Sequence, residues 1–236
     1  MSSLKIVSWN CNGGFHKKYN ALFENYPDAD IYVIEECEDP FFNPDYDFRN
    51  IFQNGFQVGS ISSPKTKGIG IIARKGIHLQ RLSWDAVGDN SFVPVLVNHK
   101  LTLIATWTHT PYTEELHNFL DANASRIKGN TVMVGDFNSN ASLDKPNKKR
   151  SHQEFVQRME NIGLSSLYHL YSGERQGEET TPTFYYKRYK DQPFHLDFAF
   201  ANKEIVESMR IAEPDKHDFW LTLSDHMPIE IVLDLL

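Results

Sequence analysis

The sequence has 236 residues, which suits one large domain or two small ones. Apolar residues form 40% of the chain, aromatic residues 13% and charged residues 23%, so the composition excludes disorder, a collagen-like repeat and a coiled coil. A formal net charge of −7 excludes a strong overall field for polyanions such as nucleic acid or anionic lipid. Any recognition of phosphate must therefore be local or assisted by a bound cation.

Eight short apolar runs rich in β-branched residues have the length and composition of strands. In chain order they span residues 4–9, 30–35, 68–74, 92–98, 101–107, 131–137, 196–201 and 229–235. No linker or internal repeat separates them, so we expect a single domain over residues 1–236.

Three segments between these runs predict helices, because their apolar residues are three or four positions apart. They are residues 16–26, 113–127 and 152–162, and the third follows a capping box at Ser151 and ends before Gly163. Residues 140–150 and 172–182 are polar and predict surface loops. Strands outnumber helices, which favours an α+β fold of two face-to-face sheets flanked by helices over a doubly wound parallel sheet.

The sequence contains no run of about 18 apolar residues, so we expect no membrane-spanning helix and no membrane partner. The first ten residues lack the basic start and apolar stretch of a secretory signal, which predicts a cytoplasmic protein. The two cysteines, Cys11 and Cys37, are too few for a disulfide framework or a structural zinc site. We expect both to be buried, reduced thiols.

Polar clusters follow two of the apolar runs near the N-terminus. Asn10 and Asn12 are two positions apart and project on one face if the strand continues that far, although Asn and Gly are also typical of turns. Glu35 and Glu36 follow the second run, and adjacent strand positions predict one carboxylate facing inward as a cation ligand and the other facing solvent. Such a pair is also common at a solvated strand end.

Further polar clusters lie in the second half of the chain. Asp136 and Asn138 flank an apolar residue at the end of a run, which fits a site or a simple turn. Asp225 and His226 precede the last run, a pairing that is common by chance. Asp197 lies among apolar residues, where a buried charge requires a partner.

Taken together, these carboxylates, amides and a histidine recur at strand ends and supply oxygen ligands for a hard cation. Mg²⁺ prefers one or two carboxylates with waters and substrate phosphates, and no Cys/His set has zinc spacing. The combination predicts metal-assisted hydrolysis of a phosphate ester, with Mg²⁺ as the cofactor and Mn²⁺ as an alternative.

The order of six motifs resembles the endonuclease/exonuclease/phosphatase superfamily, whose members share the deoxyribonuclease-I-like fold. The motifs are WNCNG, IEE, THTP, GDFNSN, HLDFAFAN and SDHMPI, and the likeness runs from Ser8 to Ile229. The resemblance implies a four-layer α/β/β/α sandwich of two mostly antiparallel sheets, with the active site at one edge of both sheets.

The resemblance also implies a metal site. Glu36 would be the principal Mg²⁺ ligand, with Asn10 and Asn12 beside the metal and Asp225 close to it. Abasic-site nucleases usually have an Asp at the position of Asn12, so this chain departs from that branch of the family. The loss of one negative charge affects the abasic-site assignment and not the hydrolytic one.

The remaining roles follow the same resemblance. Asp136 would orient or deprotonate the attacking water, and Asn138 would hold that water or the phosphoryl group. His226 would contact the phosphate and stabilise its developing charge, while Asp197 fixes its orientation and favours its protonated form. His109 stands where relatives have a His or a Tyr that contacts the phosphate.

Two segments could bind a polyanionic substrate, residues 145–150 and residues 185–190. The first is better interpreted as a solvated basic loop, whereas in the second aromatic residues alternate with cations. Tyr186, Lys187, Arg188 and Lys190 can stack on exposed bases and neutralise phosphates, although such runs are equally often solvated surface. We therefore predict a monomeric, metal-dependent phosphodiester hydrolase, most simply a nuclease acting on DNA. The alternatives are a phosphatase or phosphodiesterase for a small-molecule or lipid phosphate ester, and an inactive binding module that retains the fold.

Overall fold

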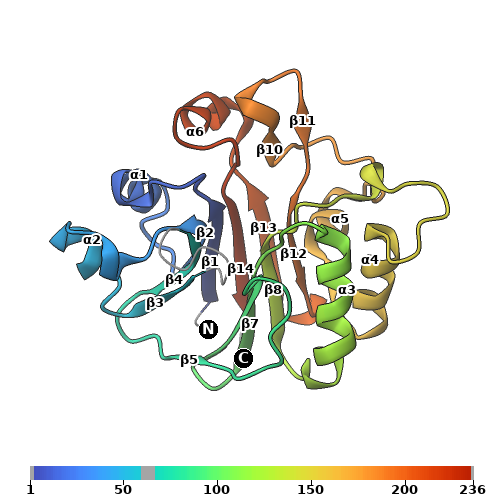
Figure 1. Ribbon diagram of the computed structural model, residues 1–236, viewed down its shortest axis with the longest axis horizontal. Helices are drawn as coiled ribbons and strands as arrows, with labels where there is room; N and C mark the ends of the chain where they lie inside the picture. The colour runs from blue at the N-terminus through green and yellow to red at the C-terminus, as the bar shows by residue number, and fades with distance from the viewer. Residues whose placement is uncertain (1–2, 60–66, 235–236) are drawn as a thin grey trace.

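The structure, a computed structural model, describes residues 3–59 and 67–234 (Figure 1). The described strands form two six-stranded sheets and one two-stranded hairpin. In spatial order the first sheet contains β13 (Val206–Ile211), β14 (Ile229–Asp234), β1 (Ser3–Asn10), β2 (Ile31–Cys37), β4 (Gly68–Ala73) and β3 (Gly55–Gly59). The second contains β5 (Leu79–Arg81), β6 (Phe92–Val97), β7 (Leu101–Trp107), β8 (Thr131–Asp136), β12 (Asp197–Ala201) and β9 (Ser165–Ser166). The hairpin pairs β10 (Phe184–Tyr185) with β11 (Pro193–Phe194).

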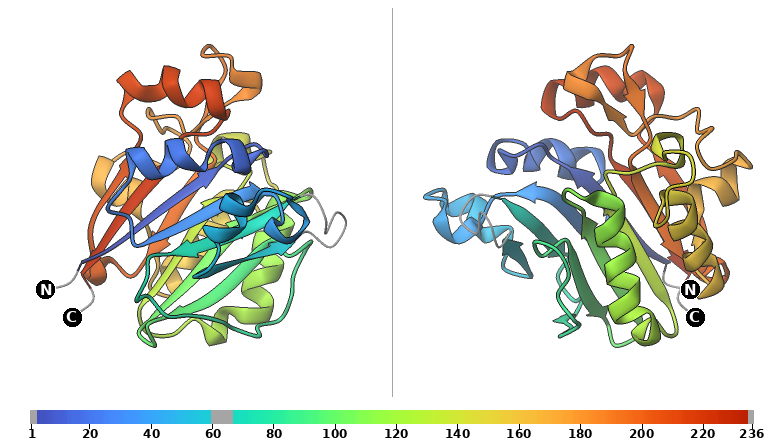
Figure 2. Two further views of the ribbon diagram at one scale, coloured as in Figure 1. Left: turned by 90° about the vertical axis from the view of Figure 1, so that its left-hand side faces the viewer. Right: turned by 45° about the vertical axis from the view of Figure 1, so that its right-hand side comes forward.

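Helices cover the outer faces of both sheets (Figure 2). The α-helices are α1 (Tyr19–Asn25), α2 (Tyr46–Asn50), α3 (Tyr112–Asn123), α4 (His152–Asn161), α5 (Leu167–Ser172) and α6 (His217–Leu223). The 3₁₀ turns are η1 (Phe15–Lys17), η2 (Pro40–Phe42), η3 (Ala124–Arg126), η4 (Ala141–Leu143), η5 (Tyr186–Arg188), η6 (Lys203–Ile205) and η7 (Pro214–Lys216). Within residues 3–59 and 67–234, no helix is both long enough and apolar enough to cross a bilayer.

Three apolar clusters separate the four layers. The central cluster lies between the sheets, and the other two join the first sheet to α1, α2 and α6 and the second sheet to α3 and α4. Side chains alternate accordingly along β1, where Ile6 faces the other sheet while Val7 and Trp9 face the helices. The α/β/β/α sandwich predicted from the sequence is therefore confirmed.

All eight predicted strands and all three predicted helices are present, with ends shifted by a few residues. The Ser151 hydroxyl caps α4 by accepting a hydrogen bond from the Glu154 backbone N–H at 3.1 Å. The Glu154 carboxylate bonds to the Arg150 backbone N–H instead of completing the reciprocal capping box. Cys11 and Cys37 are buried and unbridged in the helix-covered cluster of the first sheet.

Each sheet contains one parallel strand pair, and these two pairs position the site. Among the described strands only β1–β2 and β7–β8 are parallel, and every other pairing is antiparallel. Parallel neighbours end at the same edge of a sheet, so Asn10 lies beside Glu35, and Asp136 beside Trp107. The antiparallel strand β12 begins at this edge with Asp197 opposite Asp136.

Candidate active site

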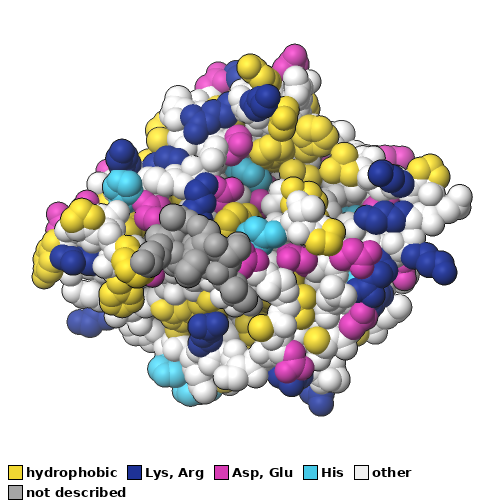
Figure 3. Space-filling view, in the orientation of Figure 1, with side chains coloured by type: hydrophobic (Ala, Val, Ile, Leu, Met, Phe, Trp, Pro, Cys, Tyr) yellow, Lys and Arg dark blue, Asp and Glu magenta, His cyan; other side chains and the backbone are white. Residues whose placement is uncertain are grey.

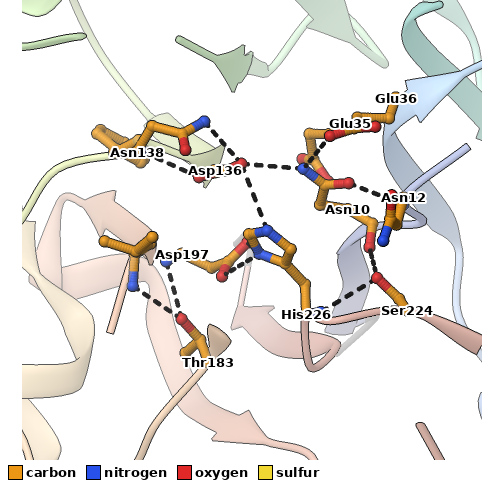
Figure 4. Close-up of polar contacts among 12 residues, drawn as sticks. Asn10, Asn12, Glu35, Glu36, Asp136, Asn138, Thr183, Asp197, Ser224 and His226 are labelled. Carbon is orange, nitrogen blue, oxygen red and sulfur yellow. Dashed lines mark hydrogen bonds and ion pairs between the residues drawn. The ribbon is translucent and has the colours of Figure 1, made fainter. Parts of the chain in front are cut away.

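Six side chains from both sheets meet at this shared edge (Figure 4). Asn10 and Glu36 come from β1 and β2 of the first sheet, and Asp136 and Asp197 come from β8 and β12 of the second. The set is completed by two loop residues, Asn138 after β8 and His226 before β14. Because the two sheets face each other, residues distant in sequence are brought within hydrogen-bonding distance.

The Asn10 amide connects the two halves of the site. Its Nδ2 donates to Asp136 Oδ2 at 2.9 Å and to Glu36 Oε1 at 3.4 Å. Its Oδ1 accepts a hydrogen bond at 2.9 Å from the backbone N–H of Asn12, a residue with φ of 51°. The Asn12 turn therefore fixes the amide, so that both carboxylates share one donor nitrogen.

Asn138 holds Asp136 from the other side. Its backbone N–H donates to Asp136 Oδ1 at 2.8 Å, and its Nδ2 donates to Oδ2 at 2.9 Å and to the Thr108 carbonyl at 3.1 Å. Asp136 is 1% exposed. Burial raises the pKa of Asp136, the Asp197 charge raises it further, and the His226 charge opposes both. The carboxylate thus has a fixed orientation and an increased affinity for a proton.

His226 and Asp197 form a buried ion pair. His226 Nδ1 lies 2.9 Å from Asp197 Oδ2, and its Nε2 lies 3.8 Å from Asp136 Oδ2. Burial alone would lower the pKa of His226, but the charges of Asp197 and Asp136 raise it above its usual value. The geometry therefore favours an imidazolium that directs Nε2 towards Asp136, and Asp197 has the partner that its burial requires.

Two hydroxyl groups fix the backbone around this pair. Thr183 Oγ accepts hydrogen bonds from the backbone N–H groups of Leu196 and Asp197, at 2.9 and 3.0 Å. Ser224 Oγ donates to the Asn10 carbonyl at 2.7 Å and accepts from the His226 N–H at 3.1 Å. Thr183 was not anticipated from the sequence, since no motif surrounds it, whereas Ser224 belongs to the SDHMPI motif.

The two adjacent glutamates differ from the expectation that one of them faces solvent. Glu35 is 0% exposed and lies on the inter-sheet side of β2, where its Oε1 accepts a hydrogen bond from Ser8 Oγ at 2.7 Å. Burial raises the pKa of Glu35 well above its usual range. Glu36 has φ of 57°, which interrupts the strand alternation and turns its carboxylate to the site. The expectation was wrong because it assumed regular strand geometry through Glu36.

A lysine that the sequence reasoning missed contacts Glu36. Lys67 Nζ lies 2.5 Å from Glu36 Oε2. Lys67 immediately precedes β4, and the pairing of Gly68 with Cys37 places it beside the end of β2. Only knowledge of this strand pairing would have revealed the contact, because the two residues are 31 positions apart.

Asp225 and His109 lie outside the hydrogen-bonded set. The Asp225 carbonyl accepts a bond from the Tyr185 N–H at 2.8 Å, and its half-buried carboxylate contributes to the raised pKa of His226. His109 is half-buried. Its ring packs edge-on against the Trp107 ring, with the centroids 4.2 Å apart, and its Nδ1 lies 3.1 Å from Ser91 Oγ. The metal role expected for Asp225 and the phosphate role expected for His109 remain predictions.

The β10–β11 hairpin stands beside the catalytic candidates, next to α6 (Figure 1). The Phe184 ring lies 4.6 Å from the His226 ring, and the Thr183 carbonyl accepts a hydrogen bond from the Met227 N–H at 2.7 Å. Tyr186 at the hairpin tip is 47% exposed. Figure 3 shows cationic side chains over this end of the molecule, mixed with acidic and apolar ones.

The four residues predicted to bind substrate are all exposed on this hairpin. The three cations among them differ in whether their charge is already paired with another group of the protein. Lys190 forms an ion pair with Asp218, and Arg188 donates to the carbonyls of Thr222 and Leu223 at 3.2 Å. Lys187 lies over the Tyr186 ring, 5.2 Å from its centroid. Within residues 3–59 and 67–234, Lys187 is thus the cation of this set that has neither a carboxylate nor a carbonyl partner.

The donor chemistry of the edge suits a hard divalent cation. Carboxylate oxygens of Glu36 and Asp136 lie on either side of the Asn10 amide, and the Lys67 ammonium already places positive charge on Glu36. Asp136, Asp197 and His226 also offer ligand atoms within 4.8 Å of one another. The two sides differ in exposure, because His226 and Asp197 form a buried ion pair whereas Glu36 is paired with the partly exposed Lys67.

Comparisons with known proteins identify the fold. No family model and no curated protein matches the sequence. The structure is similar to an AP endonuclease from Archaeoglobus fulgidus, with a TM-score of 0.72, 18% identity and coverage of 98% of this chain and 99% of that one. It is also similar to a 3′ phosphatase, NExo, from Neisseria bound to a product DNA hairpin (TM-score 0.67, 16% identity, coverage 98% and 99%). A third similar structure is the endonuclease domain of TRAS1, a telomere-specific non-LTR retrotransposon, with a TM-score of 0.65, 16% identity and coverage of 99% of each chain.

Proposed function

From its deoxyribonuclease-I-like fold, the fold of endonuclease/exonuclease/phosphatase proteins, we propose that this chain is a metal-dependent phosphoesterase that hydrolyses phosphodiester bonds of DNA. The observation that carries the proposal is the meeting of Glu36, Asp136 and His226 around the Asn10 amide at one edge of both sheets. Metal-assisted hydrolysis requires a cation site, an oriented water and a cationic donor, and these side chains supply one group for each role.

The side chains of the site would divide the reaction as follows. Asp136, held by Asn10 and Asn138, accepts a proton from the attacking water as the water oxygen bonds to phosphorus. His226, kept protonated by Asp197, stabilises the negative charge that develops on the phosphoryl oxygens. The ester P–O bond then breaks, and the leaving oxygen keeps the bonding electrons and takes a proton from water. A divalent cation held by Glu36, with Asn10, Asn12 and Asp225 nearby, would polarise the phosphoryl group when bound.

DNA is the proposed substrate because of the hairpin beside the site. Tyr186 offers an exposed ring for base stacking, and Lys187 offers a charge for a backbone phosphate. The hairpin is bonded to the segment that carries His226, so a nucleic acid bound there would extend to the catalytic candidates. The similar structures named above include nucleases and a DNA-bound phosphatase, which supports the same class of substrate.

A substrate panel tests the proposal. Plasmid DNA, an abasic-site duplex, single-stranded DNA, RNA, inositol phosphates and sphingomyelin are each incubated with Mg²⁺, Mn²⁺ or a chelator. We expect cleavage of DNA with either metal and no cleavage with the chelator. Hydrolysis that is unaffected by the chelator would contradict the metal role, and hydrolysis of the small phosphates alone would contradict the DNA assignment.

Variants test the assigned residues. His226→Ala and Asp136→Asn should reduce the hydrolysis rate by at least about 100-fold, a typical loss for a general acid–base or electrostatic group. His99→Ala is the matched control, because His99 is exposed in the β6–β7 turn at the opposite end of the second sheet. Circular dichroism shows whether each variant is folded. Wild-type rates in folded His226→Ala would refute its role.

One surface feature favours a second candidate, a phosphodiesterase for lipid substrates. Phe41 is 85% exposed and Phe42 61% exposed in η2, and Tyr46 of α2 is also exposed, in the segment that follows β2. The sequence reasoning found no apolar segment suited to membrane contact. Hydrolysis of sphingomyelin in vesicles that is faster than hydrolysis of DNA, and that is lost in folded Phe41→Ser, would favour this candidate over the nuclease.

A further inference from the structure

Lys67 occupies the carboxylate on which the proposed metal site depends. Its Nζ lies 2.5 Å from Glu36 Oε2, while Oε1 of the same carboxylate faces the Asn10 amide at 3.4 Å. Both oxygens of Glu36 are therefore engaged by donors from other segments. An ammonium group in contact with Oε2 opposes the binding of a divalent cation there, because the two positive charges repel each other at such short range.

The lysine side chain passes close to the turn that follows β1. Lys67 Cε would lie 3.0 Å from a Cβ atom placed on Gly13, a contact closer than Cβ atoms normally make. Gly13 has φ of 67°, which also favours glycine. The lysine stem thus passes over the turn after β1. With its side chain 43% exposed, the ammonium group has open solvent available when it leaves Glu36.

We propose that Lys67 is a displaceable internal cation, which neutralises Glu36 in the metal-free protein and competes with the divalent metal for that carboxylate. The proposal rests on the proposed function, because it assigns the metal to Glu36. Without Lys67, Glu36 would share the Asn10 amide with the carboxylate of Asp136 and would lose its own cationic partner, whereas Asp136 would keep His226. Lys67 therefore sets the affinity for the metal through a contact that binding must break.

Calorimetric titration of Mg²⁺ and Mn²⁺ into the substrate-free protein tests this competition. In Lys67→Gln we expect both metals to bind about two- to five-fold more tightly, the range that corresponds to one partly exposed ion pair. Lys67→Arg retains the contact and should bind the metals with nearly wild-type affinity. Lys17→Gln is the charge control, because Lys17 is exposed in η1 next to the same turn and forms no hydrogen bond or ion pair with Glu36, both being described residues.

The outcomes separate this proposal from the proposed function. If the wild-type protein binds neither metal and cleaves no phosphate ester, the proposed function fails. If the wild-type protein binds metal and Lys67→Gln binds it equally or more weakly, the competition is refuted while the proposed function stands. Equal tightening in Lys17→Gln and Lys67→Gln would show a general charge effect and would also refute the specific contact. Thermal unfolding of each variant confirms that it is folded.

Discussion

Lys187 of the hairpin provides a prediction that can be worked out from its contacts. Among the described residues its ammonium group contacts only the Tyr186 ring, whereas Lys190 is paired with Asp218 and Arg188 is bonded to backbone carbonyls. If the hairpin binds the DNA backbone, Lys187 is the cation that should contact a phosphate and release a counterion. Lys187→Gln should therefore reduce the salt dependence of DNA binding, and Lys190→Gln should change it less.

The expected size of this effect follows from counterion release. Each phosphate contact contributes about 0.9 to the slope of log affinity against log salt for duplex DNA, and about 0.7 for a single strand. Between about 50 and about 200 mM salt, wild-type affinity for a duplex should fall about 3.5-fold more than the affinity of Lys187→Gln. Fluorescence anisotropy with a labelled DNA hairpin, measured in chelator so that the substrate remains intact, provides the slopes.

Two results would refute this reasoning. A slope in Lys187→Gln equal to that of the wild type would mean that Lys187 contacts no phosphate. A slope reduced equally in Lys187→Gln and Lys190→Gln would mean that the ion pair with Asp218 does not limit the availability of Lys190. The comparison is matched, because each substitution removes one positive charge from the same hairpin.

Three further predictions concern buried titratable groups. Asp197→Asn should lower the pKa of His226 and move the alkaline loss of turnover to lower pH in a pH–rate profile; an unmoved alkaline limb would contradict it. The raised pKa of His226 stabilises the fold below about pH 6.5, and this contribution is lost as pH rises through the raised value. The unfolding free energy of Asp197→Asn should therefore fall less than that of the wild type as pH rises through this range. Glu35→Gln should change the free energy of unfolding in urea by less than about 1 kcal/mol, because burial already favours the neutral acid. A decrease in that free energy above about 3 kcal/mol would instead indicate that Glu35 is a buried carboxylate. Burial lowers the pKa of His152 to about 4, so wild-type unfolding free energy should fall by about 3 kcal/mol as pH decreases from about 6.5 to about 4, and His152→Gln should remove most of this slope.

The predictable part of the fold consists of elements that are buried on both faces. Strands such as β8 and β12 are continuous apolar runs, and their composition alone indicates them. The edge strand β13 was missed, because it is half-buried and carries charged residues at Glu207 and Arg210. The helix α6 was missed because only His217 and Trp220 are buried on its inner face.

The candidate site was predictable in its members and not in its connections. The motifs name Asn10, Asp136 and His226, but the Asn10 amide bridge depends on a turn with positive φ at Asn12. The contact between Lys67 and Glu36 depends on the pairing of β2 with β4, which a single sequence does not encode in any local pattern. Long-range contacts of this kind arise from topology, whereas motif order reflects only local chemistry.

The position of β14 between β13 and β1 has a consequence for how the protein is made. The Trp9 indole donates to the His226 carbonyl, and Ser224 Oγ donates to the carbonyl of Asn10, 214 positions earlier in the chain. While the ribosome is still producing residues before 224, β1 has a neighbour on one side only and the imidazole does not yet exist. A chain that is still being synthesised would therefore lack the proposed hydrolytic centre, and contacts of such large sequence separation make its final assembly slow.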